Sequence, residues 1–284
     1  MARTGKYYSS DLVELSRSYI LELWRALRRY EDAMVLVGGW APYFILQNFG
    51  DDPYNNDHIG SIDIDIALDP SLISETEYSS IESILEDIGY SGKVNANGDT
   101  IPFIFEKESK EMGFIIEVDI LTSNYVSKGH RHGRIGGLLA RKCHGADIAF
   151  KHFFEMRLEG ELPGGGKTIE TVKVVDVVGS ITMKGIALGE RYKEKDAYDI
   201  YYLVKFYHGG PWQVAREVGR SCSDTLIEES INTIRKEFRD RDSAACVWVS
   251  DFLDEIDDQK ERRMTDVHMN ITEFLDSLDR INIM

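Results

Sequence analysis

The chain of 284 residues is long enough for one large domain or two ordinary ones, and its 43% hydrophobic content is typical of a globular protein with a core. Its formal net charge of −16 argues against a protein that grips nucleic acid over its whole surface. No apolar run approaches the ~20 residues that span a bilayer, and no signal-peptide pattern opens the sequence, so we expect no membrane partner. Three cysteines in no metal-ligand spacing suit a reducing compartment, and we expect a cytoplasmic protein.

The first part of the chain reads as a helix, a buried strand, a glycine turn and a second helix. Apolar residues at helical spacing predict a helix over about 10–30, and the apolar run 33–37 predicts a strand. Gly38 and Gly39 follow that strand, and 40–49 reads as a helix. Glycines at this point let the backbone approach a ligand, and a helix start offers N–H groups to an anion. The alternative is that the pair forms a simple turn.

The next predicted strand, over 60–68, carries two aspartates, Asp63 and Asp65, and follows a polar loop. The aspartates alternate with apolar residues, so both carboxylates are expected on one face of the strand. Like charges this close repel and each loses water, and a divalent cation such as Mg²⁺ resolves both costs. The alternative is a solvated strand face with two surface aspartates.

A second acidic strand is expected farther along the chain. We predict an amphipathic helix at 74–88, a loop or weak hairpin at 89–100, and strands at 101–106 and 113–121. Glu117 and Asp119 lie two residues apart and share one face of the last strand. Three or four carboxylates from neighbouring strands would then converge, which favours a metal site. The alternative for Asp119 is a buried structural role.

The segment from Ile120 to Ala146 has no acidic residue in an otherwise acidic protein. Its basic side chains are Lys128, His130, Arg131, His132, Arg134, Arg141, Lys142 and His144. Such a strip can steer a phosphate-bearing ligand to one place. The alternative is a flexible, solvated loop.

The remaining chain reads as an edge hairpin followed by helices. The hairpin strands are expected at 151–161 and 168–175, and the later helices at 212–220, 224–238, 244–258 and 265–278. Between them we predict one helix over about 180–207. One face of this helix would carry Lys184, Leu188, Arg191, Lys195 and Asp199. The alternative, and the usual explanation for charged residues on one helix face, is that the face is exposed to solvent.

This order of elements predicts an α+β fold. Residues 1–175 would form a domain of strands and helices, and residues 176–284 a helical C-terminal domain.

Several motifs occur together in an informative order. A strand is followed by Gly38-Gly39 and a helix, then by Ser61-x-Asp63-x-Asp65, and then by Asp119 on a later strand. This set resembles the nucleotidyltransferase fold of the DNA polymerase β type, which implies a mixed sheet flanked by helices in residues 1–175.

Downstream, Lys184 and the segment Arg191-x-Lys193-x-Lys195-Asp196-x-x-Asp199 resemble the AbiEii-type nucleotidyltransferases. These proteins are the toxins of type IV toxin–antitoxin and abortive-infection systems. The resemblance covers about Val35 to Leu203. The chain departs from the family in a longer gap between Gly39 and Asp63, and in Lys195, where the family often has Arg.

The resemblance implies two Mg²⁺ ions, with Mn²⁺ as an alternative, between a carboxylate triad and a nucleoside triphosphate. Asp63 and Asp65 would hold both ions, and Asp119 would hold the ion that activates the acceptor hydroxyl. An in-line attack on the α-phosphorus would then expel pyrophosphate.

The resemblance also implies residues that bind the nucleotide. Gly38 and Gly39 would bring backbone donors to the outer phosphates, and Lys184 would act in catalysis by neutralising triphosphate charge. The remaining nucleotide-binding candidates are Ser61, Arg191, Lys195 and Asp199. Asp196, a catalytic candidate, and Asp199 would lie near the acceptor or position Lys184.

The implied function is transfer of a nucleoside monophosphate to RNA such as tRNA, or to a protein, by a toxin with a cognate antitoxin protein. One alternative is a small-molecule nucleotidyltransferase of the aminoglycoside type, which shares the glycine and Asp-x-Asp motifs. The Lys184, Asp196 and Asp199 motif argues against that class. The other alternative is a nucleotide-binding module without turnover, against which the intact carboxylates argue.

Overall fold

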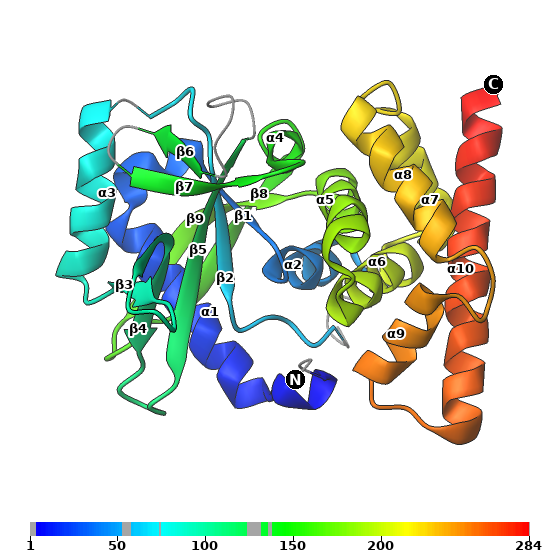
Figure 1. Cartoon of the computed structure of the whole chain (residues 1–284), viewed down its shortest axis with the longest axis horizontal. Helices are drawn as coiled ribbons and strands as arrows, with labels where there is room; N and C mark the ends of the chain where they lie inside the picture. The colour runs from blue at the N-terminus through cyan, green and yellow to red at the C-terminus, as the bar shows by residue number, and fades with distance from the viewer. Residues whose placement is uncertain (1–3, 53–57, 74, 124–131, 136–137, 284) are drawn as a thin grey trace. The chain divides into compact units, whose positions relative to one another are not determined.

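Two units make up the fold, and each combines segments that are separate in the sequence (Figure 1). The computed structural model describes residues 4–52, 58–73, 75–123, 132–135 and 138–283, with the backbone alone at 75–80, 132–135, 138–139 and 282–283. The first unit comprises Met1–Ser9, Ala41–Gly60 and Asp176–Met284, and the second comprises Ser10–Trp40 and Ser61–Val175. We call the first the helical unit and the second the sheet unit.

The strands of the sheet unit are β1 (Met34–Val37), β2 (Ile64–Leu68), β3 (Ser91–Val94), β4 (Thr100–Glu108), β5 (Ile115–Ser123), β6 (His132–Ile135), β7 (Leu138–Cys143), β8 (Phe153–Glu161) and β9 (Lys167–Val175). They form one mixed sheet in the order β3-β4-β5-β2-β1-β9-β8. Strand β2 runs antiparallel to β1 and parallel to β5, and β1 runs parallel to β9. The last residues of β5 pair in parallel with β7, which forms a hairpin ladder with β6.

The two central strands β1 and β2 are apolar with one exception. All of β1 is buried, as expected for a short apolar strand between two neighbours. In β2 the four apolar residues are buried and only Asp65 is partly exposed. Asp65 therefore differs from its neighbours in these two strands both by its charge and by its partial exposure.

The helices of the sheet unit are α1 (Ser10–Ala26), a 3-10 helix (Arg28–Ala33), α3 (Glu75–Asp87) and α4 (Ala146–Ala149). Helix α1 buries Tyr19, Leu23 and Trp24 on one side, and packs against β8 and β9. Helix α3 contacts α1 and β7, and α4 contacts β5 (Figure 1).

The helical unit contains a 3-10 helix (Gly5–Tyr7), nearly all of α2 (Trp40–Phe49), and α5 (Val177–Arg191), α6 (Glu194–Phe206), α7 (Gly210–Gly219), α8 (Thr225–Glu237), α9 (Ala244–Phe252) and α10 (Asp257–Ile283). Helix α6 is its core element, because residues 196–204 are all buried and the helix packs against α5, α7, α9 and α10. Helix α10 buries an apolar stripe that includes Val267, Ile271 and Phe274, and packs against α7 and α9 (Figure 1).

The predicted α+β class is confirmed: a mixed N-terminal sheet with helices precedes a helical region from α5 to α10. A boundary between the units falls at 175/176, where the sequence suggested one. The segments Met1–Ser9 and Ala41–Gly60 nevertheless group with the helical unit rather than with the sheet. Of the expected edge hairpin, β8 lies at the edge, whereas β9 lies between β8 and β1.

Within the described part of the chain, no helix combines the length and the apolar character needed to cross a bilayer.

Candidate functional site

The glycine turn after β1 lies directly against Asp65. Val37, the last residue of β1, pairs with Asp65 of β2, and Gly38 follows with a φ of 67°. A Cβ added to Gly38 would lie 2.0 Å from Oδ2 of Asp65. Glycine is therefore favoured by the left-handed backbone and required by the closeness of the carboxylate. Gly39 is buried and completes the turn before α2.

Asp63 lies in a bend ahead of β2 and not in the strand predicted over 60–68, because β2 begins at Ile64. Ser61 is buried, and its hydroxyl donates to the carbonyl oxygen of Asp63 at 3.2 Å, which stabilises the bend. Strand alternation therefore determines the side-chain direction of Asp65 but not that of Asp63. The sequence could not show this, since the apolar alternation continues through the bend.

Asp119 and Asp65 are register partners on the adjacent parallel strands β5 and β2. Residues paired in this way lie ~4.8 Å apart between strands and point to the same face of the sheet. Their two like charges need a nearby cation. In the structure Arg141 of β7 supplies one, with Nη2 2.5 Å from Oδ2 of Asp119.

Glu117, two residues before Asp119, belongs to a separate ion cluster. Lys93 of β3 contacts the Glu117 carboxylate, and its Nζ lies 3.2 Å from Oε1 of Glu106 on β4. The hydrogen bond to Glu117 raises the pKa of Lys93. Glu117 is thus neutralised by lysine, which removes it from the group of carboxylates expected to converge on a metal.

A complete three-ligand metal site is not assembled among the described residues, where no group of three or more His, Cys, Asp or Glu side chains is placed to hold an ion. Asp65 and Asp119 nevertheless fit Mg²⁺ chemically. This ion is commonly bound by one or two carboxylates, with water and substrate phosphates filling its other positions. The donor set suits a cation shared with a nucleotide rather than one enclosed by protein.

A helix break at Tyr192 brings together a second group of predicted residues. Helix α5 ends at Arg191, Tyr192 adopts the left-handed conformation with φ of 48°, and α6 begins at Glu194. The single helix predicted over 180–207 is therefore wrong. Neither glycine nor proline marks the break, and a left-handed tyrosine opposes local preference. The break lets α5 and α6 pack against each other.

Lys184 of α5 joins the two helices through ion pairs. Its Nζ lies 2.6 Å from Oδ2 of Asp199 and 3.1 Å from Oδ1 of Asp196. Arg191 also binds Asp196 in a bidentate manner, with Nε and Nη2 each 2.8 Å from a carboxylate oxygen. Burial by itself would lower the pKa of Lys184 and raise that of Asp196. The opposite charges outweigh burial, so the pKa of Lys184 is raised and that of Asp196 is lowered.

Asp199 is the fully buried centre of this network. Its Oδ1 lies 3.0 Å from Nζ of Lys195 and 3.0 Å from Nε2 of His58. Burial would raise the pKa of Asp199, but Lys184 and Lys195 hold it below its usual range. Burial lowers the pKa of Lys195 more than Asp199 raises it.

His58 joins the network as a neutral ring. The Gly60 N–H donates to Nδ1 of His58 at 3.1 Å, so Nδ1 accepts and Nε2 carries the proton donated to Asp199. The Tyr198 hydroxyl accepts from the N–H of Ile59 at 3.0 Å, and the rings of Tyr198 and His58 lie 5.1 Å apart. Burial lowers the pKa of His58 to about 4 and outweighs the neighbouring Asp199. The segment that ends at Gly60 is thereby tied to α6.

The predicted site residues thus form two groups. Gly38, Gly39, Ser61, Asp63, Asp65 and Asp119 belong to the sheet unit, and Lys184, Arg191, Lys195, Asp196 and Asp199 belong to the helical unit. Within the helical unit all five converge, although from two helices rather than one. The sequence analysis did not identify His58 as a site residue, because it described the segment before the strand at 60–68 only as a polar loop. The sequence analysis assigned Arg141 to the basic strip but did not identify Asp119 as its partner. That pairing depends on the register of β5 and β7, which the sequence does not show.

The basic strip is described only in part. Lys128, His130 and Arg131 lie outside the described residues, and His132 and Arg134 belong to β6 with no described side chain. The strands β6 and β7 were not expected, although Gly136-Gly137 in the sequence was an available hairpin signal. The interpretation of this strip as a loop is wrong for its described part.

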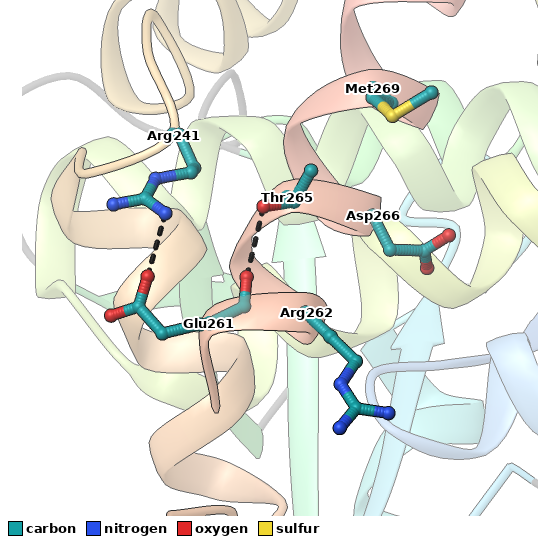
Figure 2. Close-up of a pocket in the computed structure, with 6 residues that line it drawn as sticks. All are labelled: Arg241, Glu261, Arg262, Thr265, Asp266 and Met269. Atoms are coloured by element: carbon teal, nitrogen blue, oxygen red, sulfur yellow. Dashed lines mark hydrogen bonds and ion pairs between the residues drawn. The ribbon is translucent and has the colours of Figure 1, made fainter. Parts of the chain in front are cut away.

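A shallow cavity of about 320 Å³ lies on the helical unit beside α10. Its lining residues come from parts of the chain that contain none of the predicted site residues. Figure 2 shows its lining by Arg241, Glu261, Arg262, Thr265, Asp266 and Met269. Nη1 of Arg241 lies 2.6 Å from Oε2 of Glu261, and the Thr265 hydroxyl donates to the Glu261 carbonyl oxygen at 2.9 Å. A neighbouring cavity of about 350 Å³ shares Arg262 and Asp266. None of the predicted site residues lines either cavity.

Comparison with known proteins adds no identity to this geometry, since no protein-family model and no curated protein matches the chain.

Proposed function

We propose that the chain is a metal-dependent nucleotidyltransferase with a polymerase β-like sheet domain, of the AbiEii type. The observation that carries this proposal is the register pairing of Asp65 with Asp119 beside the Gly38 turn. Two carboxylates on one sheet face, next to a turn at Gly38 that has no room for a side chain, suit a cation and phosphates bound together.

The sheet unit would bind the reacting phosphates. Mg²⁺ held by Asp65 and Asp119, with Asp63 as a further ligand, would stabilise the attacking and leaving oxygens of an in-line displacement at the α-phosphorus. Gly38 and Gly39 would admit the outer phosphates close to the backbone, where the start of α2 offers N–H groups. Ser61 would set the direction of Asp63 by stabilising the bend.

The helical unit by itself carries a buried cluster of charged side chains. Three cations, Lys184, Arg191 and Lys195, are paired with the two carboxylates of Asp196 and Asp199. The cluster thus has one positive charge in excess, a sign that favours an anion, and Arg191 is 43% exposed. Lys184 is held by two carboxylates, so direct contact with a triphosphate requires its ammonium group to leave them. Asp196 and Asp199 position Lys184 until then.

The acceptor on this proposal is RNA such as tRNA, or a protein, and the enzyme is a toxin controlled by an antitoxin protein. The experiment is incubation with each α-labelled nucleoside triphosphate, Mg²⁺ and total cell RNA, followed by gel electrophoresis. Labelled RNA that disappears in Asp65→Asn, but not in Asp87→Asn, supports transfer to RNA. Asp87 is a suitable control because it is an exposed aspartate at the end of α3.

A labelled protein band with the same dependence on Asp65 would assign a protein acceptor. Absence of label in RNA and protein with all four nucleotides would contradict the proposal.

A further inference from the structure

Arg141 lies on the same face of the sheet as the two paired aspartates. It is the register partner of Leu121 on β5, and Leu121 is two residues after Asp119. Side chains two apart on a strand share a face, and so do register partners. The backbone alone therefore directs Arg141 toward Asp119, and Asp65 belongs to the same face through its pairing with Asp119.

The side chains bear this out with a close ion pair. Nη2 of Arg141 lies 2.5 Å from Oδ2 of Asp119, and the side chains are 38% and 13% exposed. The carboxylate is thus mostly shielded from water while the guanidinium remains accessible. A charged hydrogen bond in such a position is stronger than one between exposed groups.

The pair has a consequence for a divalent cation. A guanidinium keeps its charge at any pH at which the protein is folded, so it cannot leave Asp119 by losing a proton. A cation that binds Oδ2 of Asp119 must instead displace it, and a cation that binds through Oδ1 is repelled by the guanidinium, so each binds more weakly for the presence of the other.

We propose that Arg141 is a positioning residue that holds the Asp119 carboxylate in the metal-free protein and competes with the divalent cation for it. Arg141 neutralises the repulsion between Asp65 and Asp119 and keeps the metal-free sheet stable. The divalent cation then takes over that task and releases the guanidinium. This inference rests on the proposed function for the identity of the competing ligand as a divalent metal ion.

The test is a titration with Mn²⁺ alone, without nucleotide, followed by electron paramagnetic resonance of the free ion. The proteins are wild type, Arg141→Gln and Lys142→Gln, with folding checked by circular dichroism. Both substitutions remove one positive charge from β7, but alternation directs Lys142 to the opposite face. Arg141→Gln should tighten Mn²⁺ binding by about tenfold, the scale of one lost charged hydrogen bond, whereas Lys142→Gln should change it less than about twofold.

A second readout is thermal stability. Arg141→Gln should lower the melting temperature in EDTA and show a larger rise with Mn²⁺ than wild type. If Arg141→Gln does not fold, Arg141→Lys replaces it, and its single ammonium group should give a smaller tightening in the same direction.

The outcomes separate this inference from the proposed function. If Asp65→Asn and Asp119→Asn abolish Mn²⁺ binding but Arg141→Gln binds no more tightly than Lys142→Gln, the competition is refuted and the metal site stands. If neither aspartate variant affects binding, the proposed metal site and the competition both fail. If wild type and Arg141→Gln both bind no Mn²⁺ at millimolar concentration, both fail as well. Binding that is measurable only in Arg141→Gln supports both.

Discussion

His58 and Asp199 form a buried contact in the helical unit, with Nε2 of the imidazole 3.0 Å from Oδ1 of the carboxylate and both side chains fully buried. The same carboxylate already binds Lys184 and Lys195. A protonated imidazole would add a third cation to this desolvated group, which is why burial and the lysines keep the ring neutral.

This contact predicts how stability depends on pH. The folded pKa of His58, about 4, lies below the ordinary value of 6.5, so the unfolded chain binds the proton first. The neutral His58 ring makes its full contribution to the free energy of unfolding above pH 6.5. That contribution is lost as the pH falls toward 4, and the free energy does not change further through this group at lower pH. The free energy of unfolding should fall by up to ~1.4 kcal/mol per pH unit in this window. Urea unfolding at a series of pH values measures it.

The matched variant for this prediction is His58→Gln, which should flatten that part of the pH profile. Nuclear magnetic resonance gives an independent check in the wild-type protein. The ring resonance of His58 should not shift between pH 7 and 5, and a titration midpoint near 6.5 would refute the neutral, buried ring.

Gly38→Ala should destabilise the sheet unit more than a left-handed backbone alone explains. The backbone strain costs roughly 1–2 kcal/mol. The new Cβ would in addition meet the Asp65 carboxylate at 2.0 Å. Gly98 is the control, since its φ is 87° and a Cβ there would meet no atom within 4 Å. Chemical denaturation should give a larger loss for Gly38→Ala than for Gly98→Ala; equal losses would show that the contact with Asp65 is unimportant.

Lys184→Ala should be costly, because it leaves Asp196 with one partner fewer and removes the closest cation from Asp199. Loss of one member of a buried pair costs about 3–5 kcal/mol. Lys193 is an exposed lysine in the connection between α5 and α6, and Lys193→Ala should change stability by less than about 0.5 kcal/mol. Where Lys184→Ala folds, calorimetry should show weaker triphosphate binding than in Lys193→Ala. Unchanged affinity would restrict Lys184 to a structural role.

Asp65→Asn should separate stability from activity. Removal of one of two neighbouring carboxylates relieves repulsion, so in EDTA the variant should unfold at the same or a higher temperature than wild type. Mg²⁺-dependent nucleotidyl transfer should nevertheless be lost. Thermal denaturation tests the expected stability and the labelling assay tests the expected loss of transfer, both on one preparation. A variant that labels the acceptor as well as wild type would remove Asp65 from the site.

Local signals were sufficient where an element is defined by its own residues. The apolar run before Gly38 predicted β1, and the helix predicted at 40–49 agrees with α2 as observed. The division between sheet and helical regions near 175 was also readable, because the apolar period changes from strand to helix there.

Local signals failed where distant contacts decide the conformation. The helical period continues from Lys184 to Asp199 with no glycine or proline at the turn itself, yet the chain turns at Tyr192. The ion pairs of Lys184 and Arg191 with Asp196, which exist only once α5 and α6 pack, favour the turn over the continuous helix. The helical period of the sequence does not report that energy.

The sequence by itself determined the α+β class, the glycine turn, and the identity of the carboxylates and cations, because periodicity and residue chemistry are local properties. Only the tertiary structure decided their partners. Strand register placed Asp119 beside Asp65 and brought Arg141 to Asp119 on the same face, and helix packing surrounded Asp199 with Lys184, Lys195 and His58. The reason is physical: charge pairs and register depend on which segments meet in space, and these segments are far apart along the chain.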